Sequence, residues 1–311
     1  MAEPVTVAIP VRNGGALLRD VLAAVRAQRV DHDVELLVAD THSTDGSAEL
    51  ARSFGATVLP VERFSHGGTR NFLVERAAGA HVAFLTQDAV PVDAHWLARL
   101  LAGFALADDV ALVYGPHRAR PGAPVAVARE LYDWFTSIAP DGAPRLDRTT
   151  TPSGPDATTF FTSANGALAR WAWERAPFRD VPYAEDQALA LDMLQAGFAK
   201  VFAPEAAVIH SHDYTPLAQF RRSFDEWRSL HEVHGWVQPL DPARTLLALQ
   251  SQVRADLRSV RAGELPPPVL ARELARSVRH WTVRAAGAAA GSRADRLPAG
   301  VRRWCSLERR A

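Results

Sequence analysis

Hydrophobic residues in the N-terminal half of the chain fall into short β-rich runs that alternate with stretches patterned like helices. Between the first two runs, apolar residues recur at helical spacing, at Leu17, Leu18, Val21, Leu22 and Val25. Strands that alternate with helices in this way form a mostly parallel open sheet flanked by helices, so we expect an α/β fold. The predicted strands are residues 5–10, 34–40, 56–60 and 81–86, and further predicted helices are 47–54 and 69–78.

The pattern is less regular beyond this point. It predicts a helix at 94–105, strands at 110–114, 159–162 and 201–209, and a helix at 186–196. A Pro- and Gly-rich segment at 139–157 reads as a long loop, which is usually a lid or a disordered stretch. From about Asp241 the pattern is helical, interrupted by prolines at 266–268. We therefore expect one domain at 1–240, divided near residue 115, and a helical C-terminal region at 241–311.

The composition narrows the class of protein. The chain has 311 residues, of which 48% are hydrophobic and 23% charged, and this excludes wholesale disorder. A single cysteine, Cys305, permits neither an internal disulfide nor a cysteine-based metal cluster. No apolar run approaches the ~20 residues that span a bilayer, and the first residues do not resemble a signal peptide. We expect a soluble, cytoplasmic chain.

The charges are unevenly distributed along the chain. The formal net charge is zero, which argues against a nucleic-acid partner. From Asp241 onward there are 14 Arg against 6 Asp or Glu, so the C-terminal region is basic and the remainder is acidic. Arginine is favoured throughout, with Lys200 the only lysine, so we attribute this bias to genome composition.

Two carboxylates follow predicted strands, at the sheet edge where parallel sheets bind ligands. Asp40 ends the second strand and can accept hydrogen bonds from a nucleobase or ribose, whereas the nearby Asp45 can equally cap the next helix. Asp88 follows the fourth strand and can hold a divalent cation against phosphates, because Mg²⁺ takes one or two protein oxygens. The alternative for Asp88 is a turn-forming residue ahead of Pro91.

Three further segments carry candidate chemistry. In FSHGGTRN, glycines open onto a helix, where backbone amides and Arg70 can approach a diphosphate, although Arg70 can also form a surface ion pair. Glu185 and Asp186 stand at a helix start. Capping of the helix accounts for one of the two carboxylates, and the other can serve as the general base for an alcohol. His210 and His212 follow a strand on one side and can ligate a metal or contact phosphates.

Taken in order, the strings FSHGGTRN, FLTQDAVP, AEDQALA and HSHDYT resemble family 2 glycosyltransferases of the GT-A fold, in particular the bacterial rhamnosyltransferase branch. The resemblance covers residues 5 to about 225 and makes 1–240 a catalytic domain, with a donor-nucleotide half at about 1–115 and an acceptor half at 116–240. It implies an inverting transfer of a sugar, rhamnose in this branch, from a nucleoside diphosphate to a hydroxyl of a glycan or lipid-linked acceptor in cell-envelope polysaccharide synthesis.

The resemblance also implies residue roles. Asp186 is the base, with Glu185 as its partner in the motif. Asp88 and His212 are the metal ligands for Mg²⁺ or Mn²⁺. The residues assigned to donor binding, with dTDP-rhamnose as the expected donor, are Pro10, Asn13, Asp40, Arg70, Gln87 and Asp88.

One position departs from the family pattern. Thr86 stands where the first aspartate of the metal motif is usual, and a hydroxyl is a poor substitute for a carboxylate, so we expect weakened metal dependence. The rhamnosyltransferase-like branch often carries the same Thr-Gln-Asp string, so this is not the mark of an inactive enzyme. A sugar nucleotidyltransferase and a non-catalytic sugar-nucleotide-binding scaffold are the alternatives. Sugar nucleotidyltransferases usually begin with a Gly-rich strand and loop that end in a Lys, and this chain has no such Lys. The Glu185–Asp186 pair disfavours a non-catalytic scaffold.

Two expectations concern the acceptor side. Asn165, in a segment that resembles the family's region between donor and acceptor, can hydrogen-bond a sugar hydroxyl or can simply form a turn. In residues 269–289, an apolar helix face that includes Leu274 and Val278 lies beside arginines such as Arg272 and Arg279. This helix can rest on an anionic membrane or pack on the catalytic domain.

Overall fold

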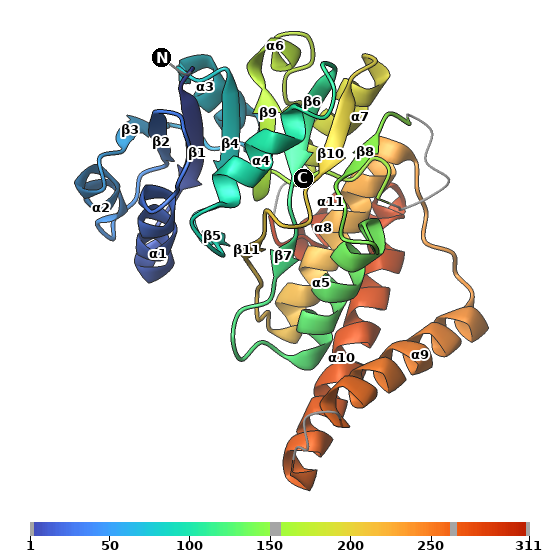
Figure 1. Ribbon diagram of the computed structural model, residues 1–311. Coiled ribbons are helices and arrows are strands. Elements are labelled where there is room, and N and C mark those ends of the chain that lie inside the picture. Colours follow the sequence, from blue (N-terminus) through green and yellow to red (C-terminus); the bar gives the residue numbers. More distant parts are fainter. Residues whose placement is uncertain (1–2, 150–156, 262–265, 309–311) are drawn as a thin grey trace. The chain divides into compact units, whose positions relative to one another are not determined.

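The computed structural model describes residues 3–149, 157–261 and 266–308 (Figure 1). Its contacts divide the chain into two compact units. The first unit comprises Met1–Arg118, Trp134–Val181 and Glu185–His210, and the second comprises Ala119–Asp133, Pro182–Ala184 and Ser211–Ala311. The helical unit therefore begins earlier than the predicted boundary at residue 240, because helix α8 (Pro216–His234) packs with the C-terminal helices.

An eight-stranded sheet forms the centre of the first unit, in the order β3-β2-β1-β4-β9-β6-β10-β8. Strands β9 and β8 run antiparallel to their neighbours and the other pairs are parallel, which confirms the predicted mostly parallel open sheet. The strands are β1 (Val5–Val11), β2 (Val34–Asp40), β3 (Thr57–Pro60), β4 (His81–Leu85), β6 (Val110–Tyr114), β8 (Arg145–Asp147), β9 (Asn165–Ala169) and β10 (Ala199–Phe202).

Helices cover both faces of this sheet. Successive side chains of a strand point to opposite faces, so Val5, Val7 and Ile9 share one core with the buried residues of α1, α2 and α4. On the other face, α3 contacts β1 and β2, and α7 contacts α3 and β10. The helices of this unit are α1 (Gly15–Arg26), α2 (Ser47–Ser53), α3 (His66–Arg76), α4 (Trp96–Phe104), α6 (Arg170–Trp173) and α7 (Glu185–Gln195).

Three elements differ from the predictions. Residues 159–162 form no strand, and the strand of this region is β9, between β4 and β6. The predicted strand at 201–209 is two strands, because Pro204 has no N–H to continue the ladder. Helix α3 begins before residue 69, at His66, because the Ser65 side chain accepts a hydrogen bond from the Gly68 N–H and caps it.

A small second sheet completes this unit. Its order is β5-β11-β7, formed by β5 (Val90–Pro91), β11 (Val208–Ile209) and β7 (His117–Arg118). The predicted 139–157 loop contains β8, and its residues 150–156 lie outside the described part of the chain. β8 is held by the buried Lys200, whose Nζ lies 2.9 Å from Asp147 Oδ2.

The second unit is helical, as predicted for the C-terminal region. Helix α10 packs along α8 and α9, with Gly287 and Gly291 against the backbone carbonyls of Phe220 and Phe224, where a Cβ would collide. Within the described residues, no helix is both long and apolar enough to cross a bilayer. The elements are α8, α9 (Pro242–Arg261), α10 (Pro267–Gly291), a 3-10 turn η1 (Ala294–Arg296) and α11 (Ala299–Cys305), with the start of α5 (Val125–Ile138).

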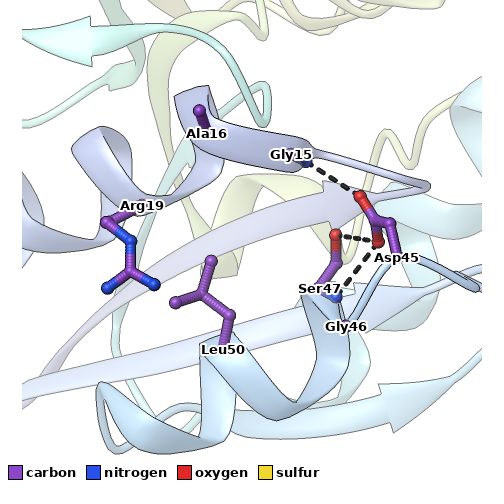
Figure 2. Close-up of a pocket in the computed structure, with 7 residues that line it drawn as sticks. All are labelled: Gly15, Ala16, Arg19, Asp45, Gly46, Ser47 and Leu50. Carbon is purple, nitrogen blue, oxygen red and sulfur yellow. Dashed lines mark hydrogen bonds between the residues drawn. The ribbon is translucent and has the colours of Figure 1, made fainter.

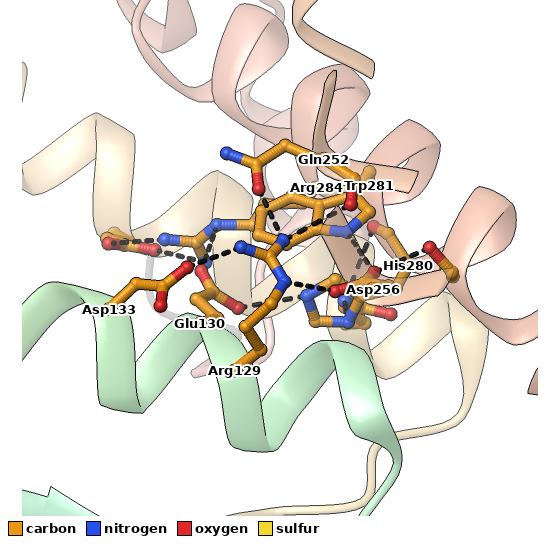
Figure 3. Close-up of polar contacts among 11 residues, drawn as sticks. Arg129, Glu130, Asp133, Gln252, Asp256, His280, Trp281 and Arg284 are labelled. Carbon is orange, nitrogen blue, oxygen red and sulfur yellow. Dashed lines mark hydrogen bonds and ion pairs between the residues drawn. The ribbon is translucent and has the colours of Figure 1, made fainter. Parts of the chain in front are cut away.

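A polar network joins the helices of this unit (Figure 3). Arg129 of α5 pairs with Asp256 of α9 and with Asp133. Asp256 also accepts hydrogen bonds from Ser277 (2.6 Å) and Trp281 (2.8 Å) of α10. Asp256 is 2% exposed, so its buried charge depends on these partners, and the network fixes the register of α5, α9 and α10.

We expect Asp256→Ala to destabilise the helical unit by about 3–5 kcal/mol, because it leaves the Arg129 guanidinium buried without its main partner. Asp133→Ala is the matched control, since the Asp133 side chain is 53% exposed and an exposed ion pair contributes about 0–1 kcal/mol. Denaturant unfolding of both variants measures the difference. Equal losses of stability would mean that the buried network does not hold these helices together.

Candidate active site

The carboxyl ends of β2 and β1 present the first predicted donor residues. At the end of β2, Asp40 Oδ2 accepts a hydrogen bond from the Ser43 N–H at 3.2 Å. The other carboxylate oxygen, Oδ1, is buried and has no hydrogen-bond partner among the described residues. An unsatisfied buried acceptor is rare in folded proteins, and this one suits a ligand that brings an N–H or O–H group.

The turn after β1 is fastened to the turn after β2. Asn13 adopts a left-handed backbone (φ 52°), donates its N–H to Ser43 Oγ at 2.9 Å and accepts from the Thr44 N–H at 2.9 Å. Pro10 lies in β1 opposite Ala39 of β2 and is half-buried. The contacts hold the two strand ends at a fixed separation, in the position predicted for donor binding.

The turn after β4 is fastened to the turn after β1. The Gln87 side chain accepts from the Arg12 N–H at 2.8 Å and donates to the Arg12 carbonyl at 3.2 Å. The amide of Gln87 therefore aligns the two turns. The buried Thr86 hydroxyl in the same turn has no hydrogen-bond partner among the described residues.

Asp88 lies beside a histidine. Asp88 Oδ1 and His210 Nε2 are 3.5 Å apart, and both side chains are largely buried. The small sheet produces this approach, because Val90 of β5 pairs with Ile209 of β11. The opposite ring nitrogen of His210, Nδ1, lies 3.4 Å from His117 Nδ1. A carboxylate oxygen suits Mg²⁺ or Mn²⁺, and an imidazole nitrogen is a ligand that transition metals accept more readily than Mg²⁺.

His212, the predicted histidine ligand, follows His210 by two positions and belongs to the second unit. Its ring is exposed and stacks on Tyr214, with the ring centroids 5.0 Å apart. Within the first unit the histidine beside Asp88 is His210, and the role of His212 as a metal ligand stays a prediction.

The predicted base stands at the start of α7. Asp186 Oδ2 accepts from the Ser163 N–H at 3.1 Å, and Oδ1 accepts from the Gln187 N–H at 2.9 Å. Glu185 is 4% exposed, and its Oε1 lies 3.3 Å from Ser163 Oγ and 2.9 Å from Arg70 Nη1. Both carboxylates are thus fixed by hydrogen bonds, and Asp186 is the more accessible of the two.

The electrostatics of this pair suit proton transfer. Burial and the neighbouring Glu185 carboxylate raise the pKa of Asp186 to about 7, against the lowering effects of Arg70 and of the Ser163 and Gln187 N–H groups. A carboxyl with a pKa near the working pH is an efficient general base, because it is substantially ionised and still binds a proton well. Perturbed groups of this kind cluster at functional sites.

Arg70 forms an ion pair inside the protein. Its side chain is 5% exposed, donates to the His66 carbonyl at 3.0 Å and pairs with Glu185. The guanidinium is thus paired with protein groups in this structure, and its role in donor binding stays a prediction. The glycines of the motif serve packing, because a Cβ on Gly67 would lie 2.0 Å from the Arg179 carbonyl oxygen.

Asn165 is also bound by protein groups. It is fully buried, and its side chain accepts from Trp96 Nε1 at 2.7 Å and donates to the carbonyls of Pro116 (3.1 Å) and Ala206 (2.8 Å). These contacts hold β9 in place, and a role of Asn165 in acceptor binding stays a prediction.

The sheet brings the predicted base and the turn after β4 to the same edge. Leu85, the last residue of β4, pairs with Asn165, the first residue of β9. The Ser163 anchor of Asp186 and the turn at 86–88 therefore lie at the same end of these neighbouring strands. The hydrogen bonds of Gln87 and Asn13 continue this edge to Asp40, across the adjacent strands β9, β4, β1 and β2.

A cavity of about 250 Å³ lies outside this edge, between the starts of α1 and α2 (Figure 2). There Asp45 accepts from the N–H groups of Gly15 (3.0 Å) and Ser47 (3.1 Å), which fits the capping role for Asp45. These bonds occupy both oxygens of the Asp45 carboxylate, and we assign the cavity no ligand. The lining residues are Gly15, Ala16, Arg19, Asp45, Gly46, Ser47 and Leu50.

An open, mostly parallel sheet with carboxylates at its strand ends agrees with the GT-A fold that the resemblance implied. Residues 6–165 match the model of glycosyl transferase family 2. The chain belongs to this family and is a glycosyltransferase.

Two rhamnosyltransferases are similar in sequence. The O-antigen chain rhamnosyltransferase RfbN of Salmonella typhimurium strain LT2 is 31% identical over 245 residues, which cover 75% of this chain and 74% of RfbN. The O-antigen chain rhamnosyltransferase WbaN of Salmonella anatum is 28% identical over 242 residues, with the same coverage of the two chains. They place the chain in the rhamnosyltransferase-like branch that the motifs indicated.

Solved structures share the fold. The mannosyltransferase PcManGT from Pyrobaculum calidifontis, in complex with GDP-Man and Mn²⁺, superposes with a TM-score of 0.63 at 20% identity, covering 94% of this chain and 88% of that one. S. aureus TarS 1–349 gives a TM-score of 0.52 at 15% identity, covering 90% of each chain. At these identities the likeness establishes the GT-A fold alone.

Proposed function

We propose that the protein transfers rhamnose from a nucleoside diphosphate donor, dTDP-rhamnose, to a hydroxyl of a glycan or lipid-linked acceptor in polysaccharide synthesis, with inversion at the anomeric carbon. The similarity to two O-antigen rhamnosyltransferases supports the sugar and the pathway class. The observation that carries the mechanism is the Asp186 carboxylate, held by Ser163 and poised near neutral pH at the same sheet edge as Asp88.

In this mechanism Asp186 accepts the proton of the acceptor hydroxyl as its oxygen attacks the anomeric carbon. The bond between that carbon and the diphosphate oxygen breaks in the same step, so the electron pair leaves with the nucleoside diphosphate. Asp40 holds the donor nucleotide through its unpartnered oxygen, and the turn at 86–88 faces the diphosphate. Proton removal by a positioned carboxylate contributes typically 10²–10⁴-fold to such a rate.

The residues at the end of β4 fit a divalent cation. Asp88 and His210 lie within 3.5 Å and offer an oxygen and a nitrogen ligand, and His212, two residues along the chain, is a third candidate. We propose that they hold Mg²⁺ or Mn²⁺, which when bound neutralises the charge of the diphosphate leaving group. The motif supplies only one carboxylate, because Thr86 stands where the first aspartate is usual. The cation would therefore depend on the donor phosphates more than it would in a motif with two aspartates.

Thermal shift with a panel of nucleotide sugars tests the donor. Binding to the folded form raises Tm by mass action. Ligand at a hundredfold excess over Kd adds about 2.7 kcal/mol to the free energy of unfolding. We expect dTDP-rhamnose to give the largest shift, increased by Mn²⁺, and transfer to an acceptor to release dTDP. Preferential stabilisation by a uridine or guanosine diphosphate sugar would contradict this donor. Binding without any release of diphosphate from donor would favour the scaffold alternative.

We also propose that α10 contacts the inner face of the plasma membrane, with the protein working from the cytoplasm. Leu274 and Val278 are exposed, at 37% and 47%, and Arg272 and Arg279 beside them are exposed too. Other residues of the predicted face, such as Trp281, pack within the helical unit. An exposed apolar and arginine-rich helix face suits anionic lipid.

Co-sedimentation with vesicles that contain anionic phosphatidylglycerol measures this contact. We expect the full chain to pellet at low salt and Leu274→Ser/Val278→Ser to pellet less. Exposed Ala271→Ser/Ala275→Ser on the same helix is the control. Equal pelleting of the three proteins would rule out docking through this face.

A further inference from the structure

Arg70 and Glu185 form a buried ion pair that no step of the proposed mechanism uses directly. Arg70 Nη1 and Glu185 Oε1 are 2.9 Å apart, and each side chain is 5% exposed. Removing two charges from water is unfavourable, so a buried pair of this kind contributes little net stability. The position of the pair suggests a role other than stabilising the fold, because Glu185 is the residue immediately before the proposed base.

The pair joins three segments that are distant in the sequence. Arg70 lies on α3 and reaches Glu185 at the start of α7. The Ser163 hydroxyl, in the segment before β9, lies 3.3 Å from Glu185 Oε1 and 3.5 Å from Asp186 Oδ2. Asn71, next to Arg70, fastens α3 to Phe178 through hydrogen bonds of 2.9 and 3.0 Å. Helix α3 thus contacts the segments that hold the proposed base, through Arg70 and Asn71.

We propose that Arg70 and Glu185 are positioning residues that set both the orientation and the charge of the Asp186 base. This inference rests on the proposed function, since it assigns Asp186 as the base. Charged groups that act on Asp186 within the described chain come from its own helix, as Glu185, and from α3, as Arg70. Glu185 disfavours ionisation of Asp186 and Arg70 favours it, so the two charges oppose each other.

The sign of each substitution follows from these two charges. A general base works in its ionised form, so activity is lost as the pH falls through its pKa. Glu185→Gln removes the charge that raises the pKa of Asp186 and leaves the Arg70 charge that lowers it. We therefore expect the acid limb of the kcat–pH profile to move toward lower pH by about one unit.

The double variant Arg70→Met/Glu185→Gln removes both charges and leaves no unpaired buried ion. Glu185 raises the pKa of Asp186 by more than Arg70 lowers it. The acid limb of the double variant should therefore lie between those of Glu185→Gln and the wild type. Arg70→Lys keeps the positive charge and should restore a profile close to the wild type. The double variant also keeps the test informative if Glu185→Gln fails to fold, because no charge is stranded in its interior.

Lys200→Met is the matched control. The Lys200–Asp147 pair is a buried ion pair of the same unit, with 0% and 8% exposure of its side chains, and it lies on β10 and β8. Its loss should lower Tm and leave the acid limb in place. A merely structural Arg70–Glu185 pair would behave in the same way.

The experiment is the kcat–pH profile of these purified full-length variants with donor and acceptor at saturation. An acid limb that shifts in Glu185→Gln and less in the double variant supports the proposal. If the acid limbs of Glu185→Gln and of the double variant both coincide with that of the wild type while Asp186→Asn is inactive, the positioning role is overturned. The assignment of Asp186 as the base then still holds. Full activity of Asp186→Asn would instead overturn the proposed function.

Discussion

Asp186→Asn is expected to lower kcat by ~10²-fold or more, with the KM for donor little changed. The amide keeps the size of the side chain and its acceptor oxygen for the Ser163 N–H, but it cannot take up the proton of the acceptor hydroxyl. The loss should therefore appear in the chemical step. Steady-state kinetics with a saturating donor measures it.

Asp192→Asn is the control on the same helix. Asp192 pairs with Arg179 and lies on the far turn of α7, so removing its charge should leave kcat close to the wild-type value. Comparable rates for Asp186→Asn and the wild type would contradict the base assignment. A fall of equal size in Asp192→Asn would show that the helix responds to any lost carboxylate.

Asp88→Asn is expected to reduce turnover by about 10²-fold or more, because several kcal/mol of leaving-group stabilisation depend on a bound cation. Binding of the nucleotide should persist, because Asp40 and the turn after β1 are unaffected. Turnover measured across a Mn²⁺ titration, with dTDP binding followed by calorimetry, separates the two effects. The variant should need more Mn²⁺ for half-maximal turnover.

Asp93→Asn provides the matched control, since this exposed carboxylate lies five residues further on and pairs with Arg99 at 2.8 Å. It should retain the Mn²⁺ response of the wild type. An unaltered Mn²⁺ response in Asp88→Asn, or the loss of dTDP binding together with turnover, would contradict the assignment of Asp88 to the cation.

Strands β1, β2, β4 and β6 could be predicted from the sequence because each of them is a run of mostly apolar and buried residues. Strand β9 could not, because Asn165 and Gly166 resemble a turn and the remaining residues are Ala and Leu. Its identity as a strand comes from its pairing with β4 and β6. Likewise, the glycines after Ser65 resemble a loop, and only the cap at Ser65 reveals the earlier start of α3.

The site was predictable where chemistry follows a strand end. Asp40 and Asp88 occupy such places, and Glu185–Asp186 stands at a helix start, so motif position alone located them. The partners of Arg70 and Asn165 were not predictable, because side-chain pairs between distant segments leave no local pattern. The same holds for Ser163, whose part in holding Asp186 appears only when the segment before β9 meets α7. A signal for Ser163 was its place next to Asn165 in the segment that resembles the family's region between donor and acceptor.

The pH dependence of kcat in the wild-type enzyme tests the central claim most directly, because it reports the ionisation of the group that removes the acceptor proton. With donor, acceptor and Mn²⁺ at saturation, the account predicts a rate that rises with a slope of one proton and a midpoint near the Asp186 pKa of about 7. A rate that is flat through neutrality, or a midpoint at the ordinary pKa of an exposed carboxylate, would contradict it.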